Sequence, residues 1–112
     1  MSYVIESSAY FDSEAKRLGK RYRSFHDDLV DFINSLQENP LQGIELSPGI
    51  RKIRMPITSK GRGKAGSARV ITGNAIVAQG EGRIAFLLIY DKADASSVKM
   101  NVVKAIAREM GF

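Results

Sequence analysis

The apolar run AFLLIY at residues 85–90 most constrains what this chain can fold into. A run without polar alternation is typical of a strand buried on both faces, so residues 83–90 are predicted to be a central strand of a sheet. Residues 68–79, rich in valine and isoleucine, predict a second strand, and Gly-Glu-Gly at 80–82 predicts a tight hairpin between the two. This β-hairpin is therefore an expected part of the sheet.

The strongest helix signal spans residues 24–40. Ser24 is the expected N-cap, acidic residues occupy the first turn, and Pro40 follows the end. The apolar residues of this segment recur at helical spacing and form a single stripe. The other expected elements are strands at 3–7 and 50–55, helices at 11–22 and 96–110, a cap for the last helix at Ser96 or Asp94, and a turn at 44–49.

The order of these elements, β-α-α-β-β-β-α, predicts an α+β fold. Two helices joined by a few residues are expected to form an antiparallel helical hairpin. This hairpin and the C-terminal helix are expected to pack on one face of a mostly antiparallel, four-stranded sheet. The length of 112 residues suits one domain, which is expected to span residues 1–112.

The composition excludes several kinds of chemistry. The chain has no cysteine, which excludes disulfides and thiolate metal sites. No apolar run approaches the roughly 18 residues of a membrane span, and no secretory signal is recognisable, so we expect a cytoplasmic protein without membrane contact. His26 is expected to be a structural or surface residue, and Asp27, Asp28 and Asp31 to be surface charge that complements the helix dipole. Neither a metal nor a small-molecule cofactor is expected.

The positive charge of the chain is concentrated in one segment. No acidic residue lies between Glu45 and Glu81, whereas the rest of the chain has ten cations against twelve acids. A compact basic patch favours a polyanionic partner, with nucleic acid as the leading candidate, although a solvated basic loop is the simpler alternative. The seven cations of the segment are Arg51, Lys52, Arg54, Lys60, Arg62, Lys64 and Arg69.

The stretch GRGKAG at residues 61–66 fits the dinucleotide-binding pattern G-x-G-x-x-G. That motif needs a strand before it and a helix after it, so that the helix N-terminus faces the pyrophosphate. Here the following residues, 67–79, predict a strand, which argues against a nucleotide cofactor. The glycines are more simply interpreted as giving a bendable basic loop that can approach a phosphate backbone.

Alternation within the predicted strands places the cations on one face of the sheet. In residues 51–55, Lys52 and Arg54 share a face, while Ile53 and Met55 are expected to pack on the helices. Arg69, between Ala68 and Val70, is expected to join the same cationic face, and Lys92 closes the cluster beyond the last strand. Such a cluster can hold a phosphodiester and stabilise its developing charge, and crowding lowers the pKa of a lysine towards general-base use.

Two stretches, RKIRMPITSKGRGKAGSARVI at 51–71 and GRIAFLLIYDK at 82–92, carry a family resemblance. The chain resembles the RelE/ParE superfamily of type II toxin–antitoxin toxins, and most closely its RelE/HigB-like branch. The resemblance implies an mRNA interferase, an endoribonuclease that enters the A site of the 70S ribosome, cleaves mRNA without metal or cofactor and leaves a 2′,3′-cyclic phosphate. It also implies a cognate antitoxin protein as a partner.

The same resemblance implies roles for individual residues. One of Lys52 and Arg54 would orient or activate the 2′-hydroxyl, and the other would bind phosphate. Arg69 would stabilise the transition-state phosphate, and Lys92 would add a cation after the last strand. Tyr90 is a further candidate, since the C-terminal helix lacks the tyrosine that some members use in catalysis. The residues expected to grip RNA are Arg51, Lys60, Arg62 and Lys64.

Two other functions stay open at the level of sequence. One is a ParE-type inhibitor of DNA gyrase, which would share the fold but would not need the cation cluster. The other is a catalytically decayed toxin that binds RNA without cleaving it.

Overall fold

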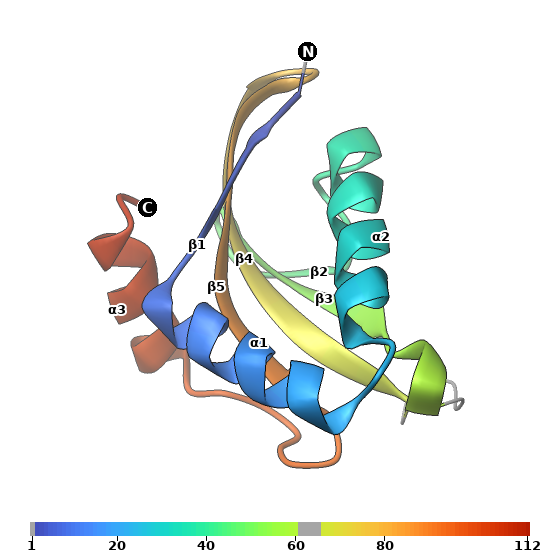
Figure 1. Cartoon of the computed structure of the whole chain (residues 1–112). Coiled ribbons are helices and arrows are strands. Elements are labelled where there is room, and N and C mark those ends of the chain that lie inside the picture. Colours follow the sequence, from blue (N-terminus) through green and yellow to red (C-terminus); the bar gives the residue numbers. More distant parts are fainter. Residues whose placement is uncertain (1, 61–65) are drawn as a thin grey trace.

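The computed structural model describes residues 2–60 and 66–112 and forms one mixed sheet with three α-helices (Figure 1). The strand order across the sheet is β1-β5-β4-β3-β2. The elements are β1 (Val4–Ser7), α1 (Ala9–Arg21), α2 (Phe25–Glu38), β2 (Ile44–Ser47), β3 (Ile50–Pro56), the 3-10 turn η1 (Thr58–Lys60), β4 (Ser67–Ala78), β5 (Glu81–Asp91) and α3 (Met100–Glu109).

The α+β prediction is confirmed, but the sheet has five strands rather than four. The missed strand is β2, within residues predicted to be a turn, and it pairs antiparallel with β3. It was missed because it is only four residues long and its register shifts between Glu45 and Ser47. The sheet is mixed because β1 runs parallel to β5, while the other neighbouring strands are antiparallel.

Strand β5 is an interior strand buried on both faces, although β4 is the middle strand. Ile84 and Phe86 pack in a core with α1 and α2, whereas Ala85 and Leu87 pack in a second core with α3. The expectation that all helices cover one face is therefore wrong. A strand that is apolar on both faces needs cover on both, and burying each large apolar side chain contributes about 1.5–3 kcal/mol.

Helices α1 and α2 do not form the predicted antiparallel hairpin. Figure 1 shows α2 turning away from α1 after the short link between them, instead of running back beside it. Each helix buries its apolar residues towards the sheet core: Phe11 and Leu18 from α1, and Phe32 and Leu36 from α2. Burial against the sheet, rather than against each other, therefore sets their directions.

Helix α3 starts later than predicted and uses neither expected cap. It begins at Met100, and its N-cap residue, Lys99, makes no side-chain capping hydrogen bond. Val103, Ile106 and Ala107 form its buried face, whereas Val102, which was expected in the apolar stripe, is 45% exposed. Upstream of the helix, the amides of Asp94 and Ala95 donate to the Asp91 carbonyl and form a turn at the end of β5.

Two glycines that have the same φ differ in how close they lie to the neighbouring backbone. Gly43 and Gly49 both have φ of +77°, but a Cβ on Gly43 would lie 2.1 Å from the Lys52 carbonyl oxygen, and one on Gly49 would lie 3.4 Å from that of Asn74. Gly49→Ala should cost about 1–2 kcal/mol of stability, and Gly43→Ala about 3 kcal/mol or more, measured by urea unfolding. Equal losses would contradict the close approach at Gly43.

Candidate functional site

In the described part of the chain, four basic side chains from three parts of the sheet line one hollow. Arg54 on β3 lies opposite Arg69 on β4, and Arg69 lies opposite Tyr90 on β5, so these residues form a row across the sheet. The volume of the hollow is about 560 Å³. The hollow, called the basic hollow below, is lined by Gln42, Gly43, Ile44, Lys52, Ile53, Arg54, Pro56, Arg69 and Lys92.

The apolar side chains between these cations determine which way the cations point. Ile53 and Met55 are buried in the core beneath α1 and α2, as predicted, and so are Ala68 and Val70. Because side chains alternate along a strand, Lys52 and Arg54 on β3 and Arg69 on β4 project from the opposite face. The alternation read from the sequence thus places these cations together, while their roles stay predictions.

Lys92 reaches the basic hollow from the residue after β5. Its amide donates to the Ser67 carbonyl at 3.4 Å, which continues the β4–β5 pairing by one residue. The Arg69 guanidinium donates to the Ser67 hydroxyl and, at 3.4 Å, to the Ala68 carbonyl. Arg69 and Lys92 are therefore both tied to the start of β4, where β4 meets the end of β5.

Arg51, which was expected to bind RNA, holds one wall of the basic hollow in place. Its side chain is 17% exposed. Its guanidinium donates to the carbonyl oxygens of Gln42 at 2.8 Å and Gly43 at 3.1 Å. These bonds fix the segment before β2, which lines the basic hollow and which the sequence did not indicate as part of a site.

Lys60, also expected to bind RNA, is paired with a buried carboxylate instead of lining the basic hollow. Its ammonium group lies 2.7 Å from Oδ1 of Asp91, a fully buried residue, and the Lys60 side chain is 12% exposed. Oδ2 of Asp91 accepts from Tyr22 Oη at 2.5 Å and from Arg21 at 2.9 Å, and Oδ1 also accepts from the Ala93 amide at 2.9 Å. We call Asp91 and these four donors the Asp91 network.

The Asp91 network keeps its central carboxyl ionised. Burial by itself raises the pKa of Asp91, but the hydrogen bonds from Lys60, Tyr22, the Ala93 amide and Arg21 outweigh burial and hold that pKa well below its usual range. The sequence signal that was overlooked is an acid placed directly after the buried run of β5.

Asp28 is a second buried carboxylate, and the expectation that it is surface charge is wrong. It is 8% exposed and accepts hydrogen bonds from the Thr58 amide at 2.8 Å, the Thr58 hydroxyl at 2.6 Å and the Ser24 hydroxyl at 2.7 Å. It therefore anchors the start of η1, whose end is anchored by Lys60. Its spacing from Phe25 and Phe32 puts it on the inward face of α2, a signal that the sequence contained.

Tyr90 does not line the basic hollow. It is 7% exposed, packs in the core beneath α3, and its hydroxyl has no hydrogen-bond partner among residues 2–60 and 66–112. Burial raises the pKa of this hydroxyl, and the nearby charge of Arg69 acts in the opposite direction. Tyr90 is therefore buried opposite Arg69 and outside the lining of the basic hollow, and a role for it stays a prediction.

The remaining predictions concern the glycine-rich stretch, metals and membranes. Arg62 and Lys64 lie outside the described residues; β4 begins at Ser67, directly after Gly66, so the stretch leads into a strand and not into the helix that a dinucleotide site requires. Within the described chain, no cluster of three or more metal-ligating side chains occurs, and no helix is long and apolar enough to cross a membrane.

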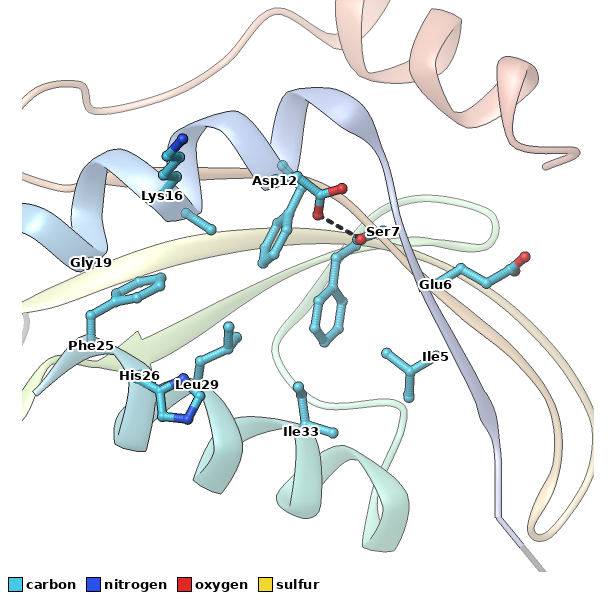
Figure 2. Close-up of a pocket in the computed structure, with 13 residues that line it drawn as sticks. Ile5, Glu6, Ser7, Asp12, Lys16, Gly19, Phe25, His26, Leu29 and Ile33 are labelled. Carbon is cyan, nitrogen blue, oxygen red and sulfur yellow. Dashed lines mark hydrogen bonds between the residues drawn. The ribbon is translucent and has the colours of Figure 1, made fainter.

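A second hollow, an apolar groove of about 490 Å³, lies between α1, α2 and β1 (Figure 2). Phe25, Leu29 and Ile33 line it from α2, with the exposed His26 beside them. Its polar lining includes Asp12, which accepts a hydrogen bond from the Ser7 hydroxyl at 2.6 Å. The α2 side chains that line this groove are mainly apolar, whereas four cations line the basic hollow, so we take the basic hollow as the candidate site.

The chain has a mixed five-stranded sheet with α1 and α2 on one face and α3 on the other, which is a RelE-like α+β fold. The chain matches a solved structure of the E. coli toxin RelE, a mutant in the free state, over 100% of both chains with a TM-score of 0.59 and 14% sequence identity. No family model and no curated protein matches the sequence. The likeness therefore lies in the fold and not in the residues.

The lowered pKa of Asp91 predicts how stability depends on pH. A folded-state pKa below the unfolded value stabilises the fold above about pH 4–5, and this contribution is lost as the pH falls towards the folded pKa. Asp91→Asn should therefore lower the free energy of unfolding by about 3 kcal/mol at pH 7, and by progressively less from pH 5 to pH 2. Urea unfolding across this pH range measures the difference, and a constant difference would refute the assignment.

Proposed function

We propose that the chain is the toxin of a type II toxin–antitoxin system and acts as an endoribonuclease on mRNA. The observation that carries this proposal is the convergence of Lys52, Arg54, Arg69 and Lys92 on one hollow. Concentrated positive charge that is preorganised on a rigid sheet suits an RNA phosphodiester and the extra negative charge of its transition state. The RelE-like fold supports the same class of protein.

The proposed reaction uses the nucleophile that RNA itself carries. The 2′-oxygen attacks the adjacent phosphorus, the bond to the 5′-oxygen breaks, and the products are a 2′,3′-cyclic phosphate and a free 5′-hydroxyl. One of Lys52 and Arg54 orients the 2′-hydroxyl, whose proton passes to solvent water as the 2′-oxygen attacks, and the other binds a phosphate oxygen. Arg69 stabilises the pentacovalent phosphorane, and Lys92 contributes further positive charge.

Among the described residues, the side chains that line the basic hollow include neither a histidine nor a tyrosine. Among these side chains, lysine ammonium groups are therefore the ones suited to donate a proton to the leaving 5′-oxygen. We propose that the ribosome supplies the remaining alignment by presenting mRNA in the A site. A cognate antitoxin protein and a cytoplasmic location belong to the same proposal.

The lack of a histidine or tyrosine at the hollow favours one alternative, a decayed toxin that binds RNA without cleaving it. Incubating the chain with labelled mRNA, with and without translating ribosomes, distinguishes the two functions. Binding without any cyclic-phosphate product would establish the alternative. A gyrase inhibitor would instead induce DNA damage while leaving mRNA intact.

The double variant Lys52→Ala/Arg69→Ala tests the proposed site. Losing two of the four cations should reduce mRNA cleavage in a translation extract by about 10²–10³-fold, because each removes stabilisation of the transition-state charge. The matched control is Lys104→Ala/Arg108→Ala, which removes the same charge from the exposed side of α3 and should leave cleavage within about twofold. Equal activity of the two double variants would show that the basic hollow is not the active site.

A further inference from the structure

Asp91 is the fully buried carboxylate next to the basic hollow. Along the chain it directly precedes Lys92, and its cross-strand partner on β4 is Ala68, which directly precedes Arg69. Because side chains alternate, Asp91 points to the side of α1 while Arg69 points into the basic hollow. One acidic residue thus lies beneath two of the four cations, on the opposite face of the sheet.

We propose that Asp91 is a positioning residue for the basic hollow, and that Lys60 and Arg21 serve as its counter-ions and not as RNA ligands. The inference rests on the proposed ribonuclease function. It assigns to Asp91 two tasks: holding the backbone on which Lys92 and Arg69 are mounted, and keeping Lys60 away from RNA.

The first task follows from the bonds that end at Asp91. Its side chain accepts from the Ala93 amide at 2.9 Å, and its carbonyl accepts from the amides of Asp94 at 2.9 Å and Ala95 at 3.2 Å. Lys92 lies inside the turn that these bonds close. Displacement of catalytic groups by about 1 Å commonly costs about 10²-fold in rate, so loosening this turn should reduce cleavage even where RNA still binds.

The second task follows from charge balance. An unpaired carboxylate beside Lys92 and Arg69 would oppose RNA phosphates and weaken the positive potential of the basic hollow. Lys60 at 2.7 Å and Arg21 at 2.9 Å cancel that charge locally. A lysine that is engaged in this way, with 12% of its side chain exposed, is not free to release counter-ions from RNA.

The first experiment compares cleavage by wild type, Asp91→Asn and the control Asp94→Asn over a range of RNA concentrations up to saturation, well below the unfolding temperature of each protein. Asp94 belongs to the same group of ion pairs, but its side chain is 39% exposed. We expect Asp91→Asn to lose at least about tenfold in kcat, with a smaller change in KM, and Asp94→Asn to stay within about twofold. An Asp91→Asn protein that is as fast as wild type would overturn the positioning role.

The second experiment remains informative even where Asp91→Asn does not fold. Binding of a single-stranded 2′-O-methyl RNA, which cannot be cleaved, is measured over a series of salt concentrations for Lys60→Met and Lys52→Met. Each lost phosphate contact should reduce the slope of log affinity against log salt by about 0.7. The slope for Lys52→Met should therefore be shallower than that of the wild type, and the slope for Lys60→Met should be unchanged. A slope for Lys60→Met that is reduced like that of Lys52→Met would overturn the counter-ion role.

The two proposals fail in different ways. A wild-type protein that neither binds nor cleaves RNA, with or without ribosomes, refutes the proposed function and this inference with it. The inference alone is refuted if the wild type is active and Asp91→Asn has the same kcat. It is also refuted if the wild type is active and Lys60→Met reduces the slope of log affinity against log salt.

Discussion

The antiparallel register of β3 and β4 brings two arginines of like charge face to face, and the candidate site depends on this arrangement. Arg54 lies directly opposite Arg69, a pairing that destabilises a sheet by itself. The burial of Ile53 and Val70 on the opposite face offsets that repulsion, because a shift of one residue would expose this apolar row to water. The core therefore holds the cations in an arrangement that they would not adopt alone. Such preorganised positive charge is the condition for strong electrostatic stabilisation of a phosphate.

Buried acids extend this arrangement beyond the strands. Asp28 binds the start of η1, while Asp91 binds its end through Lys60 and also joins the end of β5 to the end of α1. The turn η1, which follows β3, is thus held by carboxylates from two different elements. Asp91 pairs with cations, whereas Asp28 accepts from Thr58 and Ser24. Neither acid lines the basic hollow, so both leave free the space that RNA would need.

Apolar runs and strand alternation in the sequence predicted the interior strand and the orientation of the cations on β3 and β4. The run at 85–90 gave an interior strand, and alternation around Ile53 and Val70 gave the orientation of Lys52, Arg54 and Arg69. The rest depends on contacts between distant residues. Strand β2 exists because β3 pairs with it, and the pairing of Lys60 with Asp91 joins residues that are 31 positions apart. Charge counting treats every lysine alike, so it could not separate a half-buried counter-ion from a cation that lines the hollow.

The central claim is that RNA binds where Lys52, Arg54, Arg69 and Lys92 converge. The most direct measurement is a crystal structure of the chain bound to a short RNA with a 2′-O-methyl group at the intended cleavage position, which blocks the attack. The account predicts a phosphate within hydrogen-bonding distance of Arg69 and of Lys52 or Arg54, with Lys60 still paired to Asp91. RNA bound on another surface, with the basic hollow empty, would contradict it.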